Sequence, residues 1–260
     1  MDLNPFTPHA EVNALLESLL REMTTVLGER LVGLYLYGSL QTGDFDPEIS
    51  DIDLLAAVED DLDAATFAAL DAMHHRVLQA HPVWHNRLEI AYLSRRALQT
   101  FKHERSPIAV ISPGEPFNIK DAGDDWTTNW YVVQTYGMRL YGSEATDIIA
   151  PVSQAEFVQA VRDHMLAWRE YIEHVDTRPY QGYAILTMCR GLYTLRHGEQ
   201  VSKLRAAAWV QQELPREAAM IEQAIDWRRR YRDANVDPAL TFDDTRRFVL
   251  SMIERIAAEG

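Results

Sequence analysis

Two carboxylates and a small-residue turn stand close together near the start of the 260-residue chain. The turn, Gly38-Ser39, follows the apolar run 31–37, and Asp51 and Asp53 begin the next apolar stretch. Because side chains alternate along a β-strand, Asp51 and Asp53 project from the same face. Neighbouring anions are costly to bury without a cation, and oxygen ligands suit a hard divalent ion. The spacing therefore predicts a magnesium site.

The turn before these acids is suited to an anion. Gly38 has no Cβ, so backbone N–H groups can approach a phosphate closely, and the Ser39 hydroxyl adds a donor. A Gly-Ser pair alone is common in turns, and Asp-Ile-Asp alone is as often a solvated strand edge. The combination is more specific, and it predicts metal-assisted chemistry on the phosphates of a nucleoside triphosphate.

A third acid lies in the apolar segment 87–93. Alternation places Glu89 on the face opposite Leu88 and Ile90. Glu89 could be an ordinary solvated acid on an edge strand. Beside the aspartates it could instead complete the metal site, or take a proton from an attacking hydroxyl as general base. We favour the role of base.

Hydrophobic periodicity predicts the elements that position these residues. Up to residue 150 the pattern alternates between strand and helix, whereas from residue 151 onward it is helical throughout, starting with a capping box at Ser153 and Glu156. We expect an α/β (α+β) domain with a mixed sheet over 1–150, followed by an all-α helical-bundle domain over 151–260. The expected elements around the acids are strands at 31–37, 51–58 and 87–93, a short helix within 38–44, and a helix over 63–80.

Composition limits the functions open to the chain. The net charge of −14, from 39 acidic residues against 25 Lys and Arg, argues against binding a nucleic-acid backbone and favours a small or cationic acceptor. The apolar runs are shorter than the ~18 residues of a membrane span, and the N-terminus lacks the basic start of a signal peptide. We therefore expect a cytoplasmic protein without a membrane partner. The single Cys189 excludes an intrachain disulfide. We expect a monomer.

The Gly-Ser turn followed by Ser50-Asp51-Ile52-Asp53-Leu54-Leu55 resembles the signature of the nucleotidyltransferase superfamily, which includes DNA polymerase β. Over most of its length, the chain resembles the aminoglycoside (3'')(9) adenylyltransferases, which modify streptomycin and spectinomycin. The helical half follows that family's pattern LTLxRxxY, G, K, AAxW and LP at Leu186 to Tyr193, Gly198, Lys203, Ala206-Ala207 with Trp209, and Leu214-Pro215.

The resemblance implies a role for each candidate site residue. Asp51 and Asp53 bind magnesium, with Glu89 as catalytic base or further ligand. The residues implied in binding ATP are Gly38, Ser39, Ser50, Arg190, Lys203 and Tyr231, with Trp227 as an alternative to the tyrosine. A cation just after the Ser202 cap opposes the helix dipole, so a functional role explains Lys203 better than a structural one.

The acceptor site is where the chain departs from the family. Tyr180 and Tyr183 stand at positions that carry polar or acidic residues in the streptomycin and spectinomycin enzymes, and Trp130 is either a tryptophan that stacks on the drug or a core aromatic. The implied reaction transfers AMP from MgATP to a hydroxyl of an aminoglycoside or aminocyclitol and releases pyrophosphate. Two alternatives stay open: another small-molecule or protein hydroxyl as acceptor, and a non-catalytic nucleotide-binding regulatory module of the toxin–antitoxin type.

Overall fold

The computed structural model describes residues 5–230 and 237–258. The chain divides into two compact units, one formed by Met1–Phe45 with Ser50–Val152, the other by Asp46–Ile49 with Ser153–Gly260. The first unit contains a mixed β-sheet with helices, and the regular elements described in the second are all helical. The expected α/β domain followed by an all-α domain is therefore confirmed.

The sheet of the first unit has the strand order β5-β4-β3-β2-β1-β6. Its strands are β1 (Leu31–Tyr37), β2 (Ile52–Val58), β3 (Leu88–Ser94), β4 (Ser106–Ser112), β5 (Glu115–Ala122) and β6 (Met138–Gly142). Only β2 and β3 pair in parallel among the described strands. A parallel pair needs a crossover, which α3 (Ala64–Ala80) supplies. As a result, β2 and β3 begin at the same edge of the sheet.

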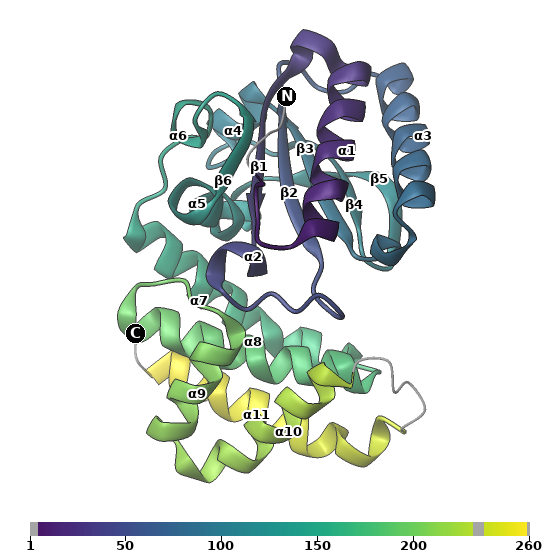
Figure 1. Cartoon of the computed structure of the whole chain (residues 1–260). Helices are drawn as coiled ribbons and strands as arrows, with labels where there is room; N and C mark the ends of the chain where they lie inside the picture. The colour runs from purple at the N-terminus through teal and green to yellow at the C-terminus, as the bar shows by residue number, and fades with distance from the viewer. Residues whose placement is uncertain (1–4, 231–236, 259–260) are drawn as a thin grey trace. The chain divides into compact units, whose positions relative to one another are not determined.

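Helices cover both faces of this sheet (Figure 1). Besides α3, they are α1 (Ala10–Leu27), α2 (Ser39–Thr42), α4 (Arg95–Thr100), α5 (Thr127–Tyr136) and α6 (Ala145–Ile148), with 3-10 turns η1 (Gly28–Arg30), η2 (Pro82–Trp84) and η3 (Asp124–Trp126). The helices α1 and α3 run side by side. Apolar residues at helical spacing on both helices pack with Leu36, Leu54 and Ile90 of the three central strands into one core.

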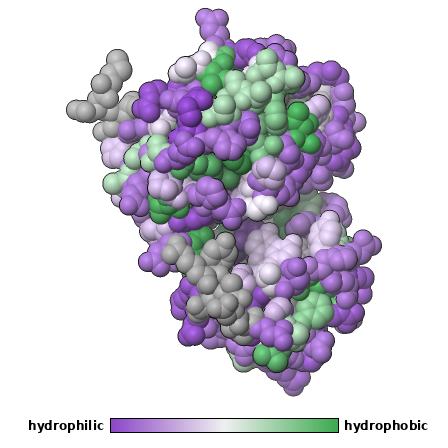
Figure 2. Space-filling model, turned by 90° about the vertical axis from the view of Figure 1, so that its right-hand side faces the viewer, coloured by the Kyte–Doolittle hydropathy of each residue, from purple (hydrophilic) through white to green (hydrophobic). Residues whose placement is uncertain are grey.

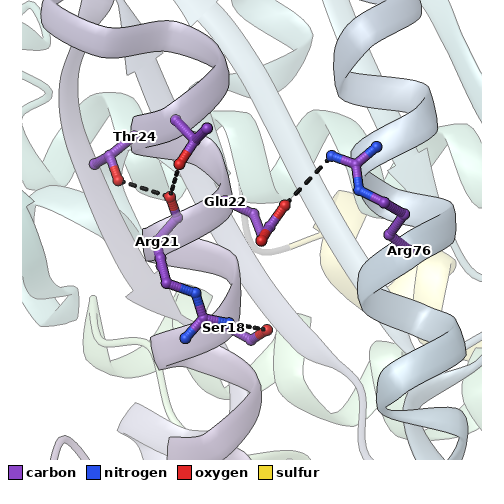
Figure 3. Close-up of polar contacts among 6 residues, drawn as sticks. Ser18, Arg21, Glu22, Thr24 and Arg76 are labelled. Carbon is purple, nitrogen blue, oxygen red and sulfur yellow. Dashed lines mark hydrogen bonds and ion pairs between the residues drawn. The ribbon is translucent and has the colours of Figure 1, made fainter.

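An ion pair also joins α1 to α3. Arg76 Nη2 lies 3.3 Å from Glu22 Oε2, and Figure 3 shows the two side chains meeting between the helices. The arginine is 57% exposed, and exposed pairs of this kind contribute about 0 to 1 kcal/mol. Burial of the apolar faces therefore holds the two helices on the sheet.

The second unit is built around one central helix. It consists of α7 (Gln154–Tyr171), η4 (Ile172–His174), α8 (Arg178–His197), α9 (Lys203–Glu213), η5 (Pro215–Glu217), α10 (Ala218–Arg229) and α11 (Ala239–Ala258). The helices α7, α9, α10 and α11 all pack against α8. The capping box is present: Ser153 Oγ accepts from the Glu156 N–H, and the Glu156 carboxylate accepts from the Ser153 N–H.

The surface of the molecule is mostly polar on the face that Figure 2 shows, with hydrophobic residues in smaller patches. This agrees with the acidic composition of the chain. In the described parts of the chain, every helix is too short or too polar to span a bilayer.

Candidate active site

The register of the sheet brings two of the predicted acids together. Asp53 is the cross-strand partner of Glu89 in the parallel pair β2/β3, and Tyr37 is the partner of Asp53 in the antiparallel pair β1/β2. Cross-strand partners point to the same face, so these three side chains share one face of the sheet. Alternation places this face opposite to the core residues Leu36 and Leu54.

The burial pattern singles out the same two positions. In β2 and in β3, every residue is buried except the second, which is Asp53 in one strand and Glu89 in the other. The sequence therefore places a carboxylate at the one position of each strand that retains access to solvent. Two adjacent acids at a partly open edge are accessible to a metal ion or a substrate without exposing the rest of the sheet.

The hydroxyl of Tyr37 responds to all three predicted acids. Burial raises the pKa of Tyr37 well above its ordinary value, and the negative charges of Glu89, Asp53 and Asp51 raise it further. The Asn129 side chain lowers this pKa. Charges affect a pKa strongly only at short range, so three carboxylates concentrate negative potential around this buried phenol.

The Gly-Ser turn lies directly against one of these acids. Gly38 has φ +75°, and a Cβ added there would overlap the Asp53 carboxylate. Only glycine allows both this backbone conformation and this close approach. Ser39 begins α2, and its hydroxyl is buried with no hydrogen-bond partner among the described residues. A buried, unsatisfied donor in the residue that follows Gly38 suits a phosphate oxygen.

These groups fit a metal that is shared with a nucleotide. Within residues 5–230 and 237–258, no three His, Cys, Asp or Glu side chains are close enough to hold a metal ion on their own. Magnesium, however, usually takes one or two protein carboxylates and completes its shell with water and substrate phosphates. Asp53 beside Gly38, with the Ser39 hydroxyl nearby, matches that requirement. Metal binding by Asp51, Asp53 and Glu89 stays a prediction.

The sequence reasoning missed Arg87, which directly precedes β3 and binds the residue before Asp51. Arg87 is 9% exposed, and its side-chain Nε donates to the carbonyl of Ser50 at 2.9 Å. Ser50, itself buried, directly precedes Asp51. The signal available in the sequence was a charged residue at the start of an apolar strand, two positions before Glu89.

The second unit carries the cations that the resemblance assigns to the nucleotide. Arg190 lies on α8 and Lys203 is the first residue of α9, and both are half-buried. The Ser202 hydroxyl caps α9. Tyr231 lies outside the described residues. Its alternative, Trp227, is buried and has the Arg178 guanidinium 5.4 Å from its ring centroid.

An aromatic cluster occupies the positions predicted to meet the acceptor. Tyr180 and Tyr183 stack with ring centroids 5.6 Å apart and are 42% and 38% exposed. Trp168 of α7 packs against both, and the Lys203 ammonium lies 4.4 Å from the Tyr183 ring centroid. The two tyrosines therefore expose an aromatic surface next to a predicted nucleotide ligand.

Trp130 differs from these tyrosines. Its side chain is 0% exposed and stacks on Trp126 with ring centroids 5.3 Å apart. A side chain without exposed surface offers no ring face to an acceptor. Of the two interpretations of Trp130, burial favours the core aromatic.

Comparisons with known proteins agree with this fold. Residues 16–111 match the model of the nucleotidyltransferase domain, and residues 147–255 match that of the C-terminal domain of aminoglycoside adenylyltransferases. The fold and the site thus define a nucleotidyltransferase enzyme. The chain belongs to the aminoglycoside adenylyltransferase family.

Solved structures show the same architecture. The crystal structure of spectinomycin adenyltransferase AAD(9) from Enterococcus faecialis with ATP and spectinomycin matches with a TM-score of 0.73 at 17% identity, covering 94% of this chain and 98% of that one. At this identity the match shows the fold. A toxin-antitoxin structure with AMP-PNP has a TM-score of 0.30 at 17% identity over 61% of this chain and 95% of that one, which carries no functional argument.

Proposed function

We propose that this enzyme transfers AMP from MgATP to a hydroxyl of an aminoglycoside or aminocyclitol related to streptomycin and spectinomycin, and releases pyrophosphate. The observation that carries the proposal is the pairing of Asp53 with Glu89 directly beside the Gly38-Ser39 turn. Membership of the family supports adenylyl transfer. The similar fold of an enzyme crystallised with ATP and spectinomycin supports this choice of substrates.

In the proposed mechanism, Asp51 and Asp53 would hold a magnesium ion, which would supply neutralisation of phosphate charge and polarisation of the reacting phosphoryl group. The Ser39 hydroxyl, the Gly38 backbone and Ser50 bind the triphosphate. Glu89 accepts the proton of the acceptor hydroxyl, whose oxygen attacks the α-phosphorus in line as the bond to pyrophosphate breaks.

The nucleotide would be bound further by residues of the second unit. Arg190 and Lys203 supply positive charge to the β- and γ-phosphates, where negative charge accumulates as pyrophosphate departs. Tyr231 completes the proposed nucleotide ligands. Within the second unit, Lys203 contacts the Tyr183 ring, so a proposed phosphate ligand adjoins the aromatic surface of Tyr180 and Tyr183.

The aromatic cluster also motivates a second candidate acceptor. Exposed tyrosines offer stacking and cation–π contacts in place of the ion pairs that acidic side chains form with ammonium groups. The same chemistry could therefore act on a different small-molecule hydroxyl or on a protein hydroxyl. The acidic composition still favours a cationic acceptor.

A pyrophosphate-release assay with ATP and magnesium tests the proposal. Turnover with streptomycin, spectinomycin or a related aminoglycoside, with the AMP adduct identified by mass spectrometry, would support it. Turnover only with other acceptors would support the second candidate. ATP binding without turnover on any acceptor would favour a regulatory module and contradict both. Protection of a susceptible bacterium that expresses the chain would add that the activity confers antibiotic resistance.

A further inference from the structure

A buried arginine connects the segments that lead into β2 and β3. The guanidinium of Arg87 donates to the Ser50 carbonyl from Nε at 2.9 Å and also from Nη2. It lies against the indole of Trp84, with Cζ 4.6 Å from the ring centroid. The backbone carbonyl of Arg87 accepts from the Ile52 N–H at 2.9 Å. One residue therefore fixes both neighbours of Asp51, Ser50 through its side chain and Ile52 through its carbonyl.

This contact lies within three residues of all three acids along the chain. Ser50 and Ile52 bracket Asp51, and Asp53 follows one residue later in β2. Arg87 stands two residues before Glu89 on the neighbouring strand. A change in the distance between Arg87 and the Ser50 carbonyl would shift Asp51 and Asp53 relative to Glu89.

Burying a guanidinium between two strands carries an unfavourable desolvation free energy, because the charge must be removed from water. Hydrophobic residues of similar volume often serve stability as well or better. The arginine differs from them by its rigid planar fork, which fixes the direction as well as the distance of the carbonyl it binds. Such directional control matters for groups that must be placed within a fraction of an ångström.

We propose that Arg87 is a positioning residue of the catalytic centre, which aligns Asp51 and Asp53 with Glu89 for the metal-bound nucleotide. Residues that orient metal ligands without touching the metal commonly change metal affinity by about 10- to 100-fold when replaced. The catalytic role of this alignment rests on the proposed function. The claim that Arg87 holds residues 50–53 in place does not depend on any reaction.

The test compares Arg87→Met and Arg87→Lys with Leu19→Ala. Leu19 is fully buried in α1, which packs on the face of the sheet opposite to the acids, so Leu19→Ala reports loss of core stability alone. Hydrogen exchange would be measured for residues 50–55. Calorimetry would give the affinity for α,β-methylene-ATP with magnesium and with EDTA. The ratio of these two affinities is the gain due to the metal.

In Arg87→Met we expect amide exchange at residues 50–55 to accelerate at least about fivefold. The gain in affinity due to magnesium should fall at least about tenfold, with binding in EDTA little changed. Arg87→Lys should lie between Arg87→Met and the unmodified protein, because it keeps the charge but loses the planar fork. Leu19→Ala should lose thermal stability and retain the metal-dependent gain.

Two results would overturn the proposal. One is that Arg87→Met changes neither the amide exchange of residues 50–55 nor the gain in nucleotide affinity due to magnesium. The other is that Leu19→Ala changes both quantities as much as Arg87→Met does. Should the unmodified protein show no gain in nucleotide affinity from magnesium, the proposed function itself would fail. Hydrogen exchange at residues 50–55 would then decide the role of Arg87 alone.

Discussion

Asp53 and Glu89 are direct neighbours across the parallel strands β2 and β3, and each is the only residue of its strand that is not buried. Parallel pairing is essential to this arrangement, because it places the beginnings of both strands at one edge of the sheet. In an antiparallel pair of the same strands, the two acids would lie at opposite edges. The crossover through α3 therefore positions the proposed site as much as the acids themselves do.

Replacing the proposed base should separate binding from chemistry. We expect Glu89→Gln to lower kcat about 10²- to 10⁴-fold, the range typical of a general base, while the affinity for ATP stays close to that of the unmodified enzyme. Steady-state kinetics and calorimetry would measure the two quantities. Glu59→Gln, the same change at an exposed acid that pairs with Arg95, is the matched control. Equal loss of ATP binding and turnover would remove the assignment of Glu89 as base.

Gly38 should tolerate no side chain. A Cβ in Gly38→Ala would overlap the Asp53 carboxylate, and φ is +75°, so we expect loss of adenylylation together with at least about 1 to 2 kcal/mol of unfolding free energy. Gly114→Ala isolates the backbone strain, because φ is +84° there but nothing lies within 4 Å of the added Cβ. The control should lose stability and keep full activity. Full activity in Gly38→Ala would contradict the described contact.

Lys203 should act on the nucleotide and leave acceptor binding unchanged. Removing a charged hydrogen-bond donor typically costs about 1.5 to 3 kcal/mol, so we expect Lys203→Gln to raise KM for MgATP or lower kcat by at least about tenfold. The KM of the acceptor should stay the same. Lys120→Gln, at a lysine on β5 that pairs with Glu115, is the control. An effect confined to the acceptor KM would reassign Lys203 to the acceptor site.

The stability of the protein should depend on pH through His74. Burial lowers the pKa of His74 from 6.5 to about 3, and Nε2 lies 2.7 Å from the Tyr92 hydroxyl. Because the folded pKa is below the unfolded one, the unfolded chain binds more protons between these values. Stability is therefore full above pH 6.5 and declines as pH falls toward 3. At pH 5 the loss relative to pH 7 is about 2 kcal/mol.

Urea unfolding at pH 7 and pH 5 would measure this loss. His74→Gln keeps a hydrogen-bonding group near Tyr92 but cannot be protonated, so its stability should fall about 2 kcal/mol less over this interval. The adjacent His75 is exposed and provides the matched control. His75→Gln should keep most of the pH dependence of the unmodified protein, because burial is the larger cause of the lowered His74 pKa and the charge of His75 the smaller one. Equal slopes in His74→Gln and the unmodified protein would refute the effect.

Residues with a strong local pattern were predictable. The strands around Asp53 and Glu89 are apolar runs interrupted by a single acid, and the structure places β1, β2 and β3 within a residue of the expected bounds. The strands β4, β5 and β6 were not predicted. Most residues of β5 and β6 are exposed or half-buried, so these edge strands lack the apolar alternation by which a strand is identified.

By itself, the sequence determined which residue types stand at which intervals: a glycine and a serine after one apolar run, and Asp51, Asp53 and Glu89 in the two that follow. Only the tertiary structure decided that β2 and β3 pair in parallel, that Arg87 is buried against the Ser50 carbonyl, and that Trp130 has no exposed surface. The physical reason is that local pattern reports propensity and alternation along one segment. Register, burial and the approach of Gly38 to Asp53 depend on contacts between segments distant in the chain.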